Sequence, residues 1–96
     1  MKAIISQPMR GKTEAQVRQE RAETVKQLEA LGYEVVDTVF LFFTDAAPLK
    51  YLAKSIAYIA EVDFVFFMRG WENARECRIE HQCCVDYGIS FKVASD

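Results

Sequence analysis

The chain has 96 residues, of which 51% are hydrophobic and 27% are charged, a length and composition typical of one globular domain. Its 12 basic and 14 acidic residues give a formal net charge of −2, which excludes the broad basic surface that binds duplex nucleic acid. No apolar stretch approaches the roughly 20 residues of a membrane span, and the short apolar start is no signal peptide, so we expect a cytoplasmic protein without a membrane partner.

Short β-branched and aromatic runs alternate along the chain with segments of helical periodicity. Proline and glycine residues separate these segments, and Thr13 with Gln16 forms a capping box at the start of the first helical one. The signals predict an alternation of strands and helices in chain order. The strands are expected over residues 2–6, 33–38, 62–68 and 89–94, and the helices between them over residues 13–32, 48–60 and 71–87. We expect residues 39–47 to form a loop.

Strands that alternate with crossover helices form parallel sheets with right-handed connections and helices on both faces. The sequence therefore predicts an α/β fold over residues 1–96, a single-domain, Rossmann-like or flavodoxin-like three-layer sandwich with a four-stranded parallel sheet in the order 2-1-3-4. Ligands of such sheets bind outside the carboxyl ends of the strands, at the point where the strand order reverses. The expected ligand site is therefore formed by residues 7–12, 39–47 and 69–73.

The last predicted helix places a carboxylate on its inner side. At about 100° per residue, Arg75 and Arg78 fall on the solvated side, whereas Glu80 falls among inward-facing residues. These inward residues are Ala74, Cys77, Cys84 and Tyr87. A buried carboxylate costs several kcal/mol unless it is paired, hydrogen-bonded or protonated. Two interpretations follow: a structural ion pair, for instance with Arg10 or Arg69, or a functional acid.

The same helix carries Cys77, His81 and Cys84 on one face. One helix face rarely supplies a tetrahedral ligand set, so we predict no metal site. With Cys83, the cysteines are odd in number and crowded into one segment, which is typical of reduced thiols.

Residues 7–12 lack the glycine spacing of dinucleotide-binding and phosphate-binding loops, so we expect no organic cofactor. Arg10 and Lys12 lie beside free helix N–H groups and nevertheless suit a phosphate, with an ordinary solvated loop as the alternative.

Large aromatic residues at the same edge of the sheet fit either stacking on a base or packing against a second subunit. They are Phe40, Phe42, Phe43 and Trp71. Three residues off the apolar stripe of the helix over 48–60 are expected at the surface or an interface: Tyr51, Lys54 and Tyr58.

Four segments, residues 5–11, 31–36, 60–63 and 70–75 with the following Ile-Glu-His, carry a resemblance to a known family. Through them, nearly the whole chain resembles the small nucleoside 2-deoxyribosyltransferase-like proteins of bacteria and phages. The resemblance implies cleavage of the N-glycosidic bond of a deoxynucleoside or its monophosphate. Glu80 would be the nucleophile, its glycosyl-enzyme resolved by water or a second base, and no metal or organic cofactor would be needed.

Active relatives carry a Gly-Thr or Gly-Ala pair before the glutamate, where residues 74–77 of this chain read Ala-Arg-Glu-Cys. We favour a protein that resembles a deoxyribosyltransferase or a deoxynucleoside (monophosphate) N-glycosidase, with Glu80 as nucleophile. The first alternative is a non-catalytic module that binds or sequesters a nucleotide-derived ligand, and the second is a structural assembly protein. The expected ligand is a nucleoside or nucleotide, and a domain this small with exposed aromatics is expected to form a homo-oligomer. Beside Glu80, the candidate ligand-binding residues are Ser6, Gln7, Met9, Arg10, Asp63, Gly70, Trp71 and Asn73.

Overall fold

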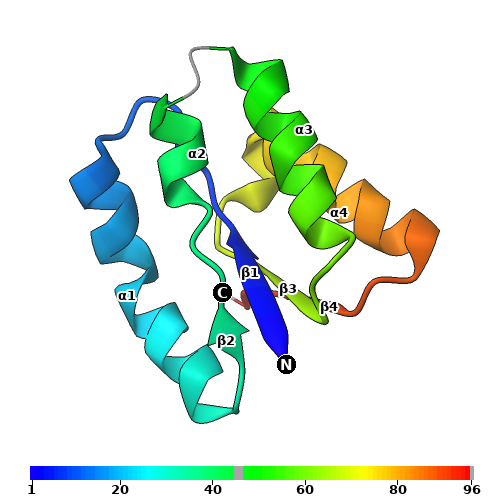
Figure 1. Ribbon diagram of the computed structural model, residues 1–96. Coiled ribbons are helices and arrows are strands. Elements are labelled where there is room, and N and C mark those ends of the chain that lie inside the picture. Colours follow the sequence, from blue (N-terminus) through cyan, green and yellow to red (C-terminus); the bar gives the residue numbers. More distant parts are fainter. Residues whose placement is uncertain (45–46, 96) are drawn as a thin grey trace.

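A four-stranded parallel sheet lies at the centre of the computed structural model, which describes residues 1–44 and 47–95. Its strands are ordered β2-β1-β3-β4, with β1 paired to both β2 and β3 (Figure 1). The predicted fold class and strand order are therefore confirmed. The strands, most of them shorter than predicted, are β1 (Lys2–Ser6), β2 (Glu34–Val35), β3 (Phe64–Phe67) and β4 (Phe91–Val93).

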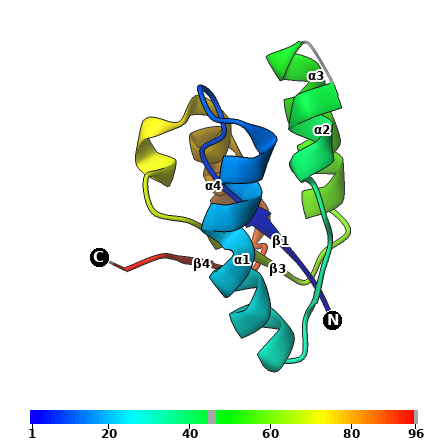
Figure 2. The same ribbon diagram turned by 90° about the vertical axis from the view of Figure 1, so that its left-hand side faces the viewer.

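Helices cover both faces of this sheet. Helix α1 lies on one face and α3 and α4 lie together on the other, while α2 packs between α1 and α3 (Figures 1 and 2). Among the described residues, no helix combines the length and the apolarity that crossing a membrane requires. The helices are α1 (Glu14–Ala30), α2 (Val39–Thr44), α3 (Pro48–Ile59), the short 3₁₀ helix η1 (Trp71–Asn73) and α4 (Arg75–Tyr87).

Local signals account for most of the helix boundaries. The predicted capping box is present at the start of α1, where Thr13 Oγ1 accepts a hydrogen bond from the Gln16 backbone and the Gln16 side chain accepts one from the Thr13 backbone. Pro48 opens α3, as expected. The predicted helix over 71–87 is divided, because Ala74 has an extended backbone that separates η1 from α4.

The loop predicted over residues 39–47 is wrong over residues 39–44, which form α2. Val39 and Leu41 are buried in a cluster that α1, α2 and α3 share, and Asp37 Oδ1 accepts a hydrogen bond from the first N–H of the helix. Tertiary burial of an apolar run thus outweighs its β-type composition. Residues 45 and 46 lie outside the described residues. Phe42 and Phe43 pack against the same cluster, which leaves less aromatic surface for a second subunit than expected.

Two predictions about helix faces are also wrong. Tyr51 is only 4% exposed, and its ring meets Phe42 edge-on at 5.4 Å between centroids, because α3 packs against α2 as well as the sheet. Tyr58, expected at the surface, is half-buried in both core clusters, whereas Lys54 is exposed. Tyr87, predicted to face inward, is 81% exposed because it is the last residue of α4.

The face of the sheet under α3 and α4 carries the tighter core. Val65 and Phe67 of β3 are fully buried there, in a cluster with Ile59 of α3 and Cys84 of α4. The alternate residue Phe66 is half-buried and lines a groove on the opposite face, beside α1. The two faces of β3 therefore make unequal contributions to stability.

We expect Phe67→Ala to lower the free energy of unfolding by about 3–5 kcal/mol, because it removes a ring that contacts three other aromatic rings. Phe66→Ala, the matched change on the other face of the same strand, should cost less than about 2 kcal/mol. Urea denaturation of both variants measures the difference. Equal losses would show that the two faces are packed alike.

Candidate functional site

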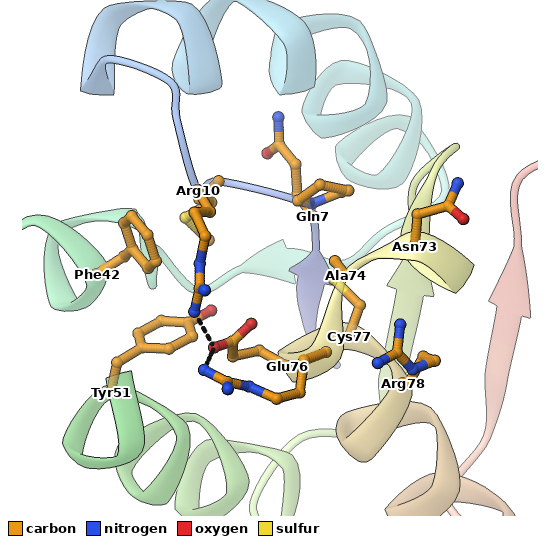
Figure 3. Close-up of a pocket in the computed structure, with 12 residues that line it drawn as sticks. Gln7, Arg10, Phe42, Tyr51, Asn73, Ala74, Glu76, Cys77 and Arg78 are labelled. Atoms are coloured by element: carbon orange, nitrogen blue, oxygen red, sulfur yellow. Dashed lines mark hydrogen bonds and ion pairs between the residues drawn. The ribbon is translucent and has the colours of Figure 1, made fainter. Parts of the chain in front are cut away.

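A pocket of about 270 Å³ opens beyond the carboxyl ends of β1 and β3 (Figure 3). Its walls come from the loop after β1, from α2 and α3, and from the junction of η1 with α4. This is the end of the sheet at which the strand order predicts a ligand. Four of the candidate residues line the pocket: Gln7, Met9, Arg10 and Asn73.

The other candidate residues lie outside the pocket wall. Asp63 precedes β3 and accepts a hydrogen bond from the Lys2 backbone at 2.7 Å, so it belongs to the opposite, amino end of the sheet. Trp71 stacks on His81, with ring centroids 4.2 Å apart, and packs against the main core. Gly70 has a φ of 90°, a conformation that favours glycine. A Cβ atom at this position would lie 3.6 Å from the Pro8 side chain in the pocket loop.

Glu80 is buried beneath this pocket, with 1% of its surface exposed. Ser6 at the end of β1 donates a hydrogen bond to Glu80 Oε1 at 2.8 Å, and Ser55 of α3 donates one to Oε2. Burial raises the pKa of the Glu80 carboxyl above its ordinary value, although the two serine hydroxyls and the charge of Arg21 act in the opposite direction. The inward carboxylate predicted from the helical pattern is therefore present.

The ion pair that was one of the two interpretations of Glu80 is not formed with either suggested arginine. Arg10 pairs with Glu76 instead, and Arg69 donates a hydrogen bond to the carbonyl of Ser95. Serine hydroxyls satisfy Glu80 because the end of β1 and the inner side of α3 both present small polar side chains to it. Ser55 was missed from the sequence, although its place three residues after Leu52 marks a polar side chain on an apolar stripe.

Glu76 brings two arginines together at the pocket. Arg10 Nη2 and Arg75 Nη2 lie 3.2 Å and 3.1 Å from the same carboxylate oxygen, Glu76 Oε1. Figure 3 shows Arg10 reaching from the loop after β1 to Glu76 at the start of α4. Burial alone would raise the pKa of Glu76, but its own backbone N–H, Arg75 and Arg10 outweigh burial and hold this pKa below its usual value. Glu76 is therefore ionised at neutral pH.

An aromatic wall faces these charges. Phe42 of α2 and Tyr51 of α3 both line the pocket and pack edge-to-face against each other (Figure 3). Burial raises the pKa of Tyr51 above its ordinary value, so its hydroxyl stays neutral at pH 7. Arg78 completes the charged side of the pocket and donates a hydrogen bond to the carbonyl of Glu72 at 3.0 Å.

A buried arginine on α1 holds Gln7 in the pocket wall. Arg21 is 4% exposed, and its Nε donates a hydrogen bond to Gln7 Oε1 at 2.8 Å. The Gln7 amide in turn donates to the carbonyl of Val17 at 3.1 Å. Burial lowers the pKa of Arg21 to about 10, which leaves it charged at neutral pH. Arg21 was missed from the sequence, because α1 is polar around most of its circumference.

The pocket offers no activated thiol. Cys77 lines it, but burial raises the pKa of this thiol to about 12, so it is not a thiolate at neutral pH. Cys77, Cys83 and Cys84 are free cysteines. Within residues 1–44 and 47–95, no group of three or more His, Cys, Asp and Glu side chains could hold a metal ion.

Comparison with known proteins gives one family. The model of a family described as a domain of unknown function, DUF4406, matches residues 1–93, which include every strand and helix of the fold and the whole pocket. No curated protein and no solved structure matches the chain.

We expect Glu80→Ala to lower the free energy of unfolding by about 3 kcal/mol, because it leaves a cavity and two buried serine hydroxyls without their acceptor. Glu80→Gln should cost far less, since the amide keeps the shape of the side chain, its oxygen accepts from one serine hydroxyl, and its N–H can donate to the oxygen of the other. Urea denaturation at neutral pH measures both changes. A Gln variant as unstable as the Ala variant would mean that the fold requires the negative charge.

The same two proteins test the pKa of Glu80. Because the folded-state pKa is raised above its ordinary value of 4.5, the folded protein holds this proton more tightly than the unfolded chain. The wild type therefore loses stability as the pH rises from the unfolded pKa through the folded pKa, and Glu80→Gln does not. Stability of the Gln variant relative to wild type should thus increase over this pH range and then level off. A difference that does not change with pH would contradict the raised pKa.

Proposed function

The chain belongs to the DUF4406 family, and from its pocket we propose that it binds a nucleoside monophosphate as a non-catalytic module that senses or sequesters this ligand. The observation that carries the proposal is the convergence of Arg10 and Arg75 at a pocket whose other wall is aromatic. One wall suits the phosphate of such a ligand and the other suits its base.

The charged wall supports a phosphate ligand. Three arginines line the pocket against one glutamate, and a guanidinium group offers paired N–H donors that match phosphate oxygens. Arg10 is 65% exposed and Arg75 is 57% exposed at the side chain, so both can turn toward a ligand. Gln7, held by Arg21, adds a fixed polar group to the same pocket.

The aromatic wall supports a nucleobase. Stacking on an aromatic ring contributes about 1–3 kcal/mol per base and tolerates every base. Phe42 is half-buried and offers ring surface at the pocket, and the buried Tyr51 supports it through an edge-to-face contact. The volume of about 270 Å³ lies just below the range for small-molecule sites, which is about 300–1,000 Å³. This size favours a mononucleotide over a dinucleotide.

The burial of Glu80 favours binding over cleavage. A nucleophile must approach the reacting carbon to about 3–3.5 Å along a free lone pair. Both oxygens of Glu80 accept serine hydrogen bonds, and Cys77, not Glu80, lines the pocket. Binding of a ligand by the pocket does not require this carboxylate to be reached from solvent.

N-glycosidic cleavage is the second candidate function. Glu80 follows Cys77 of the pocket wall by one helical turn, on the helix where the resemblance to deoxyribosyltransferases places the nucleophile. Under this candidate, the Ser6 and Ser55 hydroxyls would orient the carboxylate, and a small shift of α4 would have to open a path from the pocket. Release of free base is the measurement that separates the two functions.

We expect Arg10→Ala to weaken binding of the four 2′-deoxynucleoside 5′-monophosphates by about tenfold or more, because it removes a charge-assisted contact to phosphate. Binding of the matching nucleosides should change less than twofold. Isothermal titration calorimetry measures both sets. Arg18→Ala is the matched control, because Arg18 pairs with Glu14 and Asp37 and does not line the pocket.

Chromatography of the same mixtures tests cleavage. We expect no free base to accumulate with the wild type or with Glu80→Gln. Base release that Glu80→Gln abolishes would replace the binding function with the second candidate. Absence of binding for all four monophosphates, or equal losses for nucleotides and nucleosides in Arg10→Ala, would contradict the proposed phosphate site.

Self-association belongs to the same proposal. Leu49 of α3 is 75% exposed and Ile79 of α4 is 37% exposed, and both line an apolar groove between the two helices. We expect light scattering to give a mass above that of one chain, and Leu49→Lys to reduce it to that of one chain. A wild-type mass of one chain at micromolar concentration would contradict the prediction.

A further inference from the structure

The carboxylate of Glu76 occupies the position in which the arginine pair would hold a ligand anion. Its Oε1 lies 3.2 Å from Arg10 Nη2 and 3.1 Å from Arg75 Nη2, distances at which a phosphate oxygen would also be bound. The side chain of Glu76 is 13% exposed, whereas those of Arg10 and Arg75 are 65% and 57% exposed. The Glu76 carboxylate is thus enclosed in the pocket, whereas the two arginine side chains that contact it are largely exposed to solvent.

The two arginines come from segments that are far apart in the chain and meet only in the folded protein. Arg10 and Glu76 are 66 residues apart in the chain, one in the loop after β1 and the other in the first turn of α4. Arg75 neighbours Glu76 but belongs to the side of α4 that the sequence places in solvent. The pocket therefore contains a complete anion site whose anion is part of the chain.

We propose that Glu76 is a built-in competitor for the ligand phosphate, so that a nucleotide binds by displacing this carboxylate from Arg10 and Arg75. The inference rests on the proposed nucleotide-binding function and adds its specificity. A phosphate dianion carries more charge and more acceptor oxygens than the carboxylate and can displace it. A ligand whose anionic group is a single carboxylate exchanges one equivalent contact for another and gains no affinity from the arginines.

The opposite role for Glu76 makes the opposite prediction. If Glu76 served to position the arginines for the ligand, its removal would let their exposed side chains disperse and would weaken binding of the nucleotide. If Glu76 is a competitor, its removal leaves the arginines free for the phosphate and strengthens binding. The direction of the change in affinity therefore decides between the two roles.

The experiment titrates the four 2′-deoxynucleoside 5′-monophosphates and their nucleosides into the wild type, Glu76→Gln and Glu72→Gln. Glu72→Gln removes the same charge from an exposed position four residues earlier, outside the pocket wall. Glu76→Gln should bind the best monophosphate at least fivefold more tightly than the wild type. Its nucleoside affinity, and both affinities of Glu72→Gln, should stay within twofold of the wild type.

Two further variants complete the test. Glu76→Ala should also bind the monophosphate more tightly than the wild type, even if the Gln side chain perturbs the pocket in Glu76→Gln. A thermal melt confirms that the Ala variant is folded. In Arg10→Ala combined with Glu76→Gln, the gain should largely disappear, because the competitor acts through this arginine.

The outcomes distinguish failure of the competitor role from failure of the proposed function. An unchanged or weaker nucleotide affinity in both Glu76 variants, with measurable wild-type binding, would overturn the competitor and leave the proposed function standing. Equal gains in Glu72→Gln and Glu76→Gln would also overturn it, because they would reflect net charge alone. Absence of nucleotide binding in the wild type and in every variant would overturn the proposed function together with the inference.

Discussion

A carboxylate buried between α4, β1 and α3 holds these three elements in register. Within residues 1–44 and 47–95, no arginine forms an ion pair with Glu80, and a carboxylate in the core must be satisfied by hydrogen bonds or lose its charge. The hydroxyls of Ser6 and Ser55 supply those bonds from two different elements. Because both bonds must form together, α4 can neither rotate about its axis nor slide along the sheet without leaving a buried polar group unpaired. Arg21, buried near β1 against the other face of the sheet, adds a favourable charge at longer range.

The pocket follows from this placement of α4. With Glu80 directed into the core, the residue one turn earlier, Glu76, comes to the rim of the pocket and meets Arg10 from the loop after β1. The two glutamates thus share one side of the helix and differ in environment: the inner one has a raised pKa and the outer one a lowered pKa. The inner glutamate is hydrogen-bonded within the core, and the outer glutamate lines the pocket.

This division of roles is the physical basis of the proposed function. A site for a nucleoside monophosphate needs an anion-binding wall, a flat apolar wall and limited volume, and the pocket combines all three. A glycosidase would further need an acid that is open to the ligand. The structure encloses Glu80 and exposes Arg10 and Arg75, so affinity and specificity for a phosphate, rather than bond cleavage, agree best with the geometry.

The strand order 2-1-3-4 was predicted from the usual topology of alternating α/β folds, and the structure confirms it. The sequence by itself determined the alternation of strands and helices, the capping box at Thr13 and the inward direction of Glu80. These features depend on local periodicity and on contacts within one turn of chain, which a sequence records directly. Only the tertiary structure decided that the apolar run 39–44 is a helix, that Tyr51 is buried, and that Glu76 pairs with Arg10. Each of these depends on which distant segments pack together, and the partners of Glu80 and Glu76 lie up to 74 residues away along the chain.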